Sequence, residues 1–217
     1  TRTLQPTNNL SLMRRSVCGG QPYNCRPADN PGKKLKNAEE LLRTSVWGPS
    51  LTTEEMTKAL AGTFERSFAP GAFICMKGEP VDYWMGIIDG LGKMASHWNT
   101  GKTTSLTGIS TGGWFGEGSL LKSEPRRYDV MALRETRVAF MSRATFLWLL
   151  DHSIPFNRYM IAQLNERLGQ FIGMIENERM LDTDARIARG LAALFNPVLY
   201  PGTLRLLQIS QEELGYL

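Results

Sequence analysis

Short runs of strand-forming residues, each closed by a turn signal, fill the middle of this chain from Ala72 to Met141. Typical turn signals are Lys77-Gly78-Glu79-Pro80 and the hairpin-like Asn99-Thr100-Gly101-Lys102. The expected strands are residues 72–76, 83–88, 92–97, 103–109, 128–133 and 137–140. Because no long helices separate them, these strands are expected to pair antiparallel in a sandwich or barrel. The sequence therefore predicts an α+β fold built on an antiparallel, jelly-roll-like β-roll.

Helical patterns flank the predicted roll. Thr52 and Glu55 have the spacing of a capping box, and a possible short helix covers residues 37–42. After the capping box, an apolar helical face recurs every four residues at Met56, Leu60 and Phe64. We expect Pro70-Gly71 to end this segment.

A longer helix is expected from Pro155 to Leu181. Its apolar residues alternate spacings of three and four, which is the pattern of an a/d seam: Ile161, Leu164, Leu168, Phe171 and Ile175. Such a seam can pack on the roll. However, Met160, Met174 and Leu181 form a second apolar stripe, so one stripe is free for a partner chain. The pattern favours a homodimer.

The glycine-rich stretch from Thr111 to Val130 contains the candidate ligand site. A Gly-Gly turn precedes the carboxylate of Glu117, and the adjacent guanidinium groups of Arg126 and Arg127 follow Pro125. Glycines allow a close approach to the backbone, arginine binds phosphate, and a carboxylate accepts hydrogen bonds from sugar hydroxyls. A small sugar-phosphate molecule fits this combination.

Phe115-Gly116-Glu117 through Pro125-Arg126 resembles the phosphate-binding cassette of cyclic-nucleotide-binding domains. The upstream segments 68–71 and 77–79 resemble the first strands and turn of the same roll. From about Trp47 onward, the chain is similar to bacterial transcription regulators of the CRP–FNR family. The resemblance implies a β-roll, a dimerisation helix, a winged helix-turn-helix domain and no catalysis.

This resemblance also implies an effector site. Its expected members are Phe115, Gly116, Glu117, Gly118, Ser119, Arg126, Arg127, Phe171 and Ile172. Glu117 would bind the ribose and Arg126 the phosphate; alternatively, the two would form a structural ion pair in an empty roll. Arg127 and Gly118 depart from the family pattern, which leaves open a cyclic nucleotide or another small anionic effector. No other cofactor and no metal site is expected.

The last part of the chain resembles the start of a DNA-binding domain. Residues 181–188 read Leu-Asp-Thr-Asp-Ala-Arg-Ile-Ala and resemble the family's hinge, with Asp182 or Thr183 as a helix cap. A strand is expected at 204–209. A capped helix follows, and it would carry the DNA contacts that the resemblance implies: Ser210, Gln211 and Glu212. The sequence ends at Leu217, before a recognition helix is expected. Double-stranded DNA is the expected partner, and RNA polymerase is a further one.

Composition adds three constraints. The chain is 42% hydrophobic and 21% charged, as in globular proteins, and it has no apolar run of membrane-spanning length, so a cytoplasmic protein without membrane contact is expected. Residues 1–36 carry a net charge of +6 in a chain of net charge +4, which predicts a flexible basic tail. Cys18, Cys25 and Cys75 are too few for a four-cysteine cluster.

The expected organisation has four parts: a basic tail at 1–46, the roll with flanking helices at 47–152, the dimerisation helix at 153–181, and the start of a winged helix-turn-helix at 182–217. One alternative is a cyclic-nucleotide-binding module that regulates an enzyme or channel without binding DNA. A cupin-like metal enzyme is disfavoured because His97 and His152 form no paired-histidine motif.

Overall fold

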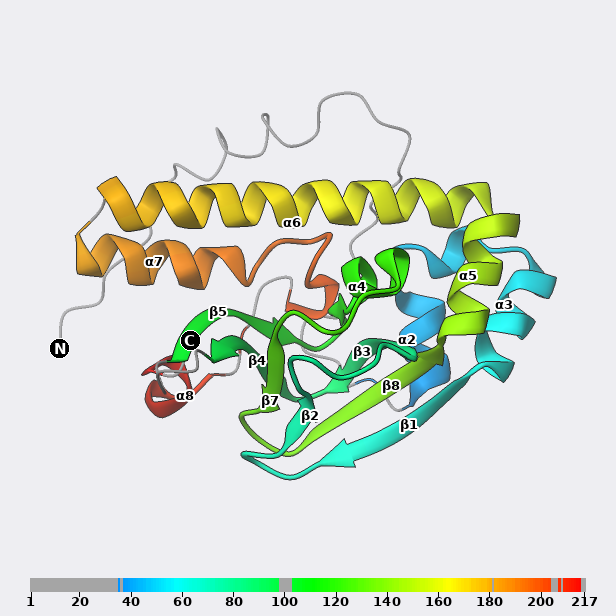
Figure 1. The fold of residues 1–217 in the computed structure, drawn as a ribbon, viewed down its shortest axis with the longest axis horizontal. Coiled ribbons are helices and arrows are strands. Elements are labelled where there is room, and N and C mark those ends of the chain that lie inside the picture. Colours follow the sequence, from blue (N-terminus) through cyan, green and yellow to red (C-terminus); the bar gives the residue numbers. More distant parts are fainter. Residues whose placement is uncertain are drawn as a thin grey trace, which may run out of the picture.

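The computed structural model describes residues 35, 37–97, 103–180, 182–203, 207 and 209–215. In this part of the chain, two four-stranded antiparallel sheets form a β-roll, and helices cover it on one side and at one end (Figure 1). The strands are β1 Thr63–Phe68, β2 Phe73–Cys75, β3 Tyr83–Asp89, β4 Leu91–His97, β5 Thr103–Ser110, β6 Trp114–Phe115, β7 Asp129–Ala132 and β8 Thr136–Ser142. The helices are α2 Ala38–Thr44, α3 Thr53–Ala61, α4 Glu117–Lys122, α5 Arg143–His152, α6 Ile154–Met180, α7 Thr183–Ala193 and α8 Gln211–Gly215.

The two sheets have strand orders β1-β8-β3-β6 and β2-β7-β4-β5, and all strand pairs are antiparallel. The six strands expected between residues 72 and 141 are present, with bounds shifted by one or two residues, whereas β1 and β6 were not expected. The predicted α+β fold, with an antiparallel β-roll and a long helix, is confirmed. The expected hairpin tip at 99–102 lies outside the described residues, as do Cys18, Cys25 and residues 1–34 and 36 of the expected basic tail.

Alternation along β3 divides the apolar residues between two cores. Trp84 and Ile88 face the helices, whereas Met85 and Ile87 face the interior of the roll. This is the period of two that a strand imposes on its side chains. Strand β8 follows the same rule, because Ala139 and Met141 lie on the helix side and Val138 and Phe140 on the interior side.

We call the first cluster the helix-side core, and it includes Leu41, Leu42, Trp47, Trp84, Ile88, Trp114, Phe146, Leu149, Phe156 and Tyr159. Trp84 and Trp114 stack with ring centroids 4.2 Å apart. Because Leu41 and Leu42 of α2 are fully buried here, residues 38–46 belong to the packed domain. These residues, which were expected in the tail, therefore pack against the roll.

One predicted helix is shorter than expected. The capping box is present, since the Thr52 hydroxyl accepts from Glu55 N–H at 3.2 Å and the Glu55 carboxylate accepts from Thr52 N–H at 2.7 Å. The helix nevertheless ends at Ala61, and Phe64 lies in β1, stacked on Phe140 of β8. Gly62 follows as the helix C-cap, and a side chain does not fit there, because a Cβ would lie 1.9 Å from the Thr145 hydroxyl.

The second cluster, which we call the roll interior, extends beyond the sheets. Its strand residues are Ile74, Cys75, Met85, Ile87, Met94, Ile109, Phe115, Val130, Ala132, Val138 and Phe140. The same cluster contains Leu194, Leu199 and Tyr200, which follow α7. Helix α7 runs back along α6 (Figure 1), and the chain after it returns to the roll. The segment expected to begin a separate domain therefore completes a core of the roll.

Candidate functional site

The cassette predicted from the sequence starts at the end of β6, turns at Gly116, forms α4 and continues to Arg126. Phe115 is fully buried in the roll interior, and Gly116 begins α4 in the left-handed region, with φ of 95°. Glycine adopts this conformation without strain. A Cβ on Gly116 would lie 3.0 Å from Nη1 of Arg126. The turn and the Arg126 guanidinium are thus neighbours, as the sequence suggested.

Arg126 is buried, with 6% of its surface exposed. Its backbone is fixed by the turn at Gly78-Glu79, because Arg126 N–H donates to the Glu79 carbonyl at 3.0 Å and its own carbonyl accepts from Gly78 N–H at 2.8 Å. Nη2 donates to the Tyr83 carbonyl at 3.2 Å. No carboxylate among the described residues forms an ion pair with it. A buried cation without a counterion destabilises the folded protein by about several kcal/mol, so the Arg126 guanidinium is suited to bind an anion.

Glu117 has a different partner from the one the alternative interpretation gave it. Its Oε1 accepts from Nε of Arg167 on α6 at 2.7 Å, and both side chains are buried. Arg167 Nη2 also donates to the Trp114 carbonyl. Burial alone would lower the pKa of Arg167, but the Glu117 carboxylate together with Tyr200 and Tyr128 raises it by more. Arg167 therefore stays charged, and the expected Glu117–Arg126 ion pair is absent.

The other cassette residues lie nearer the surface. Gly118 is exposed, and a Cβ there would meet nothing within 4 Å. The Ser119 hydroxyl donates to the Pro125 carbonyl at 3.4 Å. Arg127 points away from Arg126, because its Nε donates to Glu124 Oε2 at 3.1 Å on the exposed side. The hydrogen bond from Arg127 is the main cause that lowers the pKa of Glu124.

Helix α6 contributes residues that sequence reasoning missed. Gln163, Arg167 and Gln170 follow one another at spacings of four and three, so they lie on one face of the helix. Gln163 Nε2 donates to the Trp114 carbonyl at 3.2 Å, and Gln170 Nε2 to the Thr107 hydroxyl at 3.1 Å. Three polar residues at helical spacing within the predicted long helix were the available signal.

Several buried polar atoms in this region have no hydrogen-bond partner among the described residues: Glu117 Oε2, Arg167 Nη1, Gln163 Oε1 and Gln170 Oε1. Buried polar groups are nearly always satisfied in native proteins. The face of α6 toward the cassette therefore has unused capacity to bind a polar ligand.

The two α6 residues expected near the effector point in different directions. Phe171 packs against the roll interior, whereas Ile172 is 49% exposed. The expected seam changes accordingly, because Phe171 leaves it and Ile172 takes its place. The outer face of α6, which we call the α6 stripe, exposes Ile161, Leu164, Leu168, Ile172 and Ile175, with exposures from 38% to 66%.

The glycine turn before the cassette packs against a later segment of the same chain, residues 200–202. A Cβ on Gly112 would lie 3.0 Å from the Gly202 nitrogen, and one on Gly113 would lie 3.2 Å from the Tyr200 ring. A Cβ on Gly202 would lie 2.3 Å from the Thr111 carbonyl oxygen. The close approach expected for a ligand is therefore made by residues 200–202.

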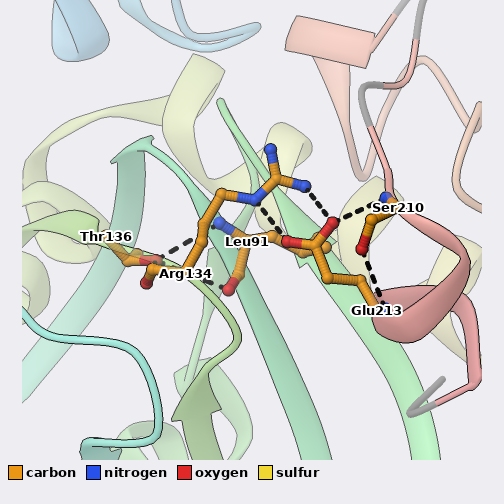
Figure 2. Close-up of polar contacts among 5 residues, drawn as sticks. All are labelled: Leu91, Arg134, Thr136, Ser210 and Glu213. Carbon is orange, nitrogen blue, oxygen red and sulfur yellow. Dashed lines mark hydrogen bonds and ion pairs between the residues drawn. The ribbon is translucent and has the colours of Figure 1, made fainter.

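The helix expected to carry DNA contacts begins with a reciprocal cap. Ser210 N–H donates to Glu213 Oε2 at 2.8 Å, and Glu213 N–H donates to the Ser210 hydroxyl at 3.1 Å (Figure 2). Gln211 and Glu212 are exposed. Most of the expected strand at 204–209 lies outside the described residues.

The Glu213 carboxylate also binds the roll through Arg134, with Nε donating to Oε1 at 2.7 Å and Nη2 to Oε2 at 2.9 Å (Figure 2). Burial tends to raise the pKa of Glu213, but Ser210 N–H and the Arg134 guanidinium lower it by more. The backbone of Arg134 is itself held by Thr136, whose hydroxyl donates to the Arg134 carbonyl at 2.8 Å.

Neither metal-binding clusters nor membrane-spanning helices occur in the described ranges. No three His, Cys, Asp or Glu side chains there are grouped to hold a metal ion. None of the helices of these ranges has the length and apolar character needed to cross a membrane. Cys75 is a free, buried thiol whose pKa is raised by burial to about 11.

Comparison with known proteins agrees with this geometry. The family model described as "Cyclic nucleotide-binding domain" matches residues 65–153, which run from β1 to the end of α5 and include the whole cassette. Among solved structures, the sensor domain of the transcriptional regulator DNR from Pseudomonas aeruginosa has a TM-score of 0.56 and 20% identity, and the match covers 63% of this chain and 91% of that chain. This likeness shows the shared fold.

Two curated relatives are described as protein kinase regulatory subunits and not as transcription regulators. The chain is 24% identical over 187 residues to the cAMP-dependent protein kinase regulatory subunit of Dictyostelium discoideum, covering 83% of this chain. It is 31% identical over 140 residues to the cAMP-dependent protein kinase type II regulatory subunit of Drosophila melanogaster, covering 64% of this chain. It spans only 57% and 36% of the length of these two proteins.

Proposed function

We propose, starting from a cyclic-nucleotide-binding domain at residues 65–153, that this chain is a homodimeric regulator of transcription that binds DNA. In this proposal the roll senses a cyclic nucleotide or a similar small phosphate-bearing effector. The signal passes through α6 and α7 to the C-terminal segment. The protein acts by changing conformation, and no catalytic step is required.

The observation that carries the sensing role is the buried guanidinium of Arg126. It lies beside the glycine turn at Gly116 and has no carboxylate partner in the described part of the chain. The charge-assisted hydrogen bonds that a phosphate would accept from it are each worth about 1.5–3 kcal/mol. The cyclic phosphate supplies the missing counterion, and Glu117 on the same turn would take the sugar hydroxyl.

Nucleotide titration tests this role most simply. We expect cyclic AMP or cyclic GMP to bind the purified protein in isothermal titration, and Arg126→Gln to lower the affinity by roughly tenfold to a hundredfold. Arg127→Gln is the matched control, because it removes the same charge from the adjacent, exposed position. Equal losses in the two variants, or no loss in either, would contradict the proposal.

Dimer formation is supported by the α6 stripe. Leu168 and Ile161 are 57% and 66% exposed on a helix of 27 residues, next to three further exposed apolar residues. A continuous apolar stripe on a helix is commonly covered by a second helix. Two copies of α6 packed along this stripe would place two C-terminal segments side by side, which matches two DNA half-sites about one helical turn apart.

DNA binding is supported by the chain order after α6: a helix capped by Asp182, then a second one capped by Ser210. A selection from random genomic DNA fragments tests it, with the full-length protein as bait and salt varied. We expect enriched fragments with two related half-sites and an affinity that falls steeply with salt. Failure to enrich any sequence under effector-free and effector-loaded conditions would count against this role.

A second candidate is favoured by the curated relatives, both of which are regulatory subunits of cAMP-dependent protein kinases. In that case the roll would be a regulatory module for a partner enzyme. It predicts nucleotide binding with no DNA enrichment and a specific complex with a catalytic subunit. The α6 stripe favours the homodimeric regulator instead.

A further inference from the structure

We infer that residues 194–203 and 209–215 form an autoinhibitory closure over the roll, and that this closed arrangement competes with ligand binding at the cassette. This inference rests on the proposed function for its ligand. The closed arrangement itself depends on contacts that can be tested separately.

The first contact is the insertion of Leu199 and Tyr200 into the roll interior. They are 2% and 0% exposed, and they belong to the same cluster as Phe115 of the cassette. The Tyr200 hydroxyl lies 3.4 Å from the Thr107 hydroxyl and accepts from Gln170 Nε2 at 3.4 Å. Tyr200 therefore joins strand β5 to α6 beside the predicted ligand site.

The second contact fixes the turn that carries these residues. Asn196 Oδ1 accepts from the N–H groups of Val198 and Leu199 at 2.9 and 3.0 Å. Its Nδ2 donates to Glu166 Oε2 on α6 at 2.9 Å. The turn is thus tied to α6, the helix that also holds Glu117 through Arg167.

The third contact is the bidentate Arg134–Glu213 ion pair, which fastens α8 to the turn between β7 and β8 (Figure 2). Arg134 and Glu213 side chains are 33% and 15% exposed. This pair links the roll to the helix that the proposed function assigns to DNA binding. As long as it persists, α8 is held on the roll.

Competition with a ligand follows because groups expected to bind the ligand already have partners within the chain. Glu117, the expected sugar-binding carboxylate, is already paired with Arg167. The glycine turn at Gly112-Gly113 is in contact with residues 200–202. A nucleotide that approaches this turn must displace residues 200–202, so ligand binding and release of the segment that contains them are coupled. The apparent affinity is then lowered by the fraction of closed protein.

Gly202→Ala is designed to open the closure without changing the cassette. Its added Cβ would lie 2.3 Å from the Thr111 carbonyl oxygen, so the closed arrangement cannot form unchanged. Gly190→Ala in α7 is the matched control, because its Cβ meets nothing within 4 Å. The ion pair is tested independently with Arg134→Glu, Glu213→Arg and the double variant that exchanges the two charges.

Hydrogen exchange of residues 198–200 is measured first, without nucleotide. We expect Gly202→Ala and each single charge variant to speed exchange at least tenfold relative to wild type, and the exchanged pair to restore slow exchange. Gly190→Ala should resemble wild type. Unchanged exchange in Gly202→Ala and in both single charge variants would overturn the closure.

Titration with cyclic AMP and cyclic GMP follows. We expect the variants that open the closure to bind more tightly than wild type by about threefold to tenfold, and the charge exchange to return the affinity to the wild-type value. Equal affinity in open and closed variants would overturn the competition. Faster exchange with no nucleotide bound by any variant would instead reject the proposed ligand while supporting the closure.

Discussion

Strand β3 separates two cores that differ in chemistry. The helix-side core is dominated by indole and phenyl rings, and Trp84, Trp114 and Trp47 contact one another there. The roll interior lies beside three charged groups, Arg126, Glu117 and Arg167. It also contains Leu199 and Tyr200, which lie more than 40 residues after the end of α5 and reach it because the chain folds back. Apolar contacts need no particular partner, whereas buried charges do. We expect the first core to stabilise the fold, and the closure inferred above makes the second core the place where partners change.

The largest expected effect is on the helix-side core. Trp84→Ala should lower the free energy of unfolding by roughly 3–5 kcal/mol, because it leaves a cavity among stacked rings. Trp148→Ala on the half-buried face of α5 is the control and should cost clearly less. Urea denaturation measures both. Equal losses would mean that the aromatic cluster has no special part in stability.

The next largest effect is expected at the Glu117–Arg167 ion pair beside the roll interior. Arg167→Gln should lower the free energy of unfolding by about 3 kcal/mol, since it leaves the buried Glu117 carboxylate unpaired. Adding Glu117→Gln should recover part of this loss, because two neutral side chains no longer need each other. A strictly additive double variant would contradict the role of the ion pair.

A change in the α6 stripe is expected to alter the oligomeric state and not the folding of the protein. Leu168→Asp places a charge at a position that is 57% exposed, so helix content should be unchanged by circular dichroism. In sedimentation velocity, the wild-type protein should sediment as a dimer and the variant as a monomer. Ala144→Asp adds the same charge to exposed α5 and should remain dimeric. A monomeric wild-type protein would reject the stripe as a dimer interface.

The smallest expected effect is the pH dependence of the Arg134–Glu213 contact. The folded pKa of Glu213 lies below the usual 4.5. The stability that its ionised carboxylate gives to the folded protein is therefore fully present above about pH 4.5 and is lost as the pH falls through the lowered pKa. Exchange of α8 amides should rise in that acid range in wild type. It should rise less in Glu213→Gln, which has no carboxylate to protonate. An equal acid response in both proteins would place the titrating group elsewhere.

Local signals accounted for much of the fold. Turn residues and β-type runs predicted six of the eight described strands, all but β1 and β6, and caps at Thr52, Asp182 and Ser210 predicted three helix starts that the structure contains. These features depend on residues a few positions apart. The cassette was also recognisable, because Gly116, Glu117 and Arg126 are close in sequence.

Contacts between residues far apart in the sequence could not be predicted from such local signals. Glu117 binds Arg167, which is 50 positions away, rather than Arg126. Phe64 continues a helical pattern, yet contacts across the sheet and the lack of space at Gly62 make it a strand residue. Nothing in the local pattern of Leu199-Tyr200 indicates burial in the roll. Such outcomes depend on tertiary packing, which a single sequence does not specify.

The most direct test compares the two cores in one measurement: hydrogen exchange of the wild-type protein with and without saturating cyclic nucleotide. We predict that residues 198–200 exchange faster in the bound protein, although ligands usually slow exchange, while amides of β3 and α5 around the helix-side core stay protected. If bound nucleotide slows residues 198–200 or leaves them unchanged, the roll interior does not change partners and this account is contradicted.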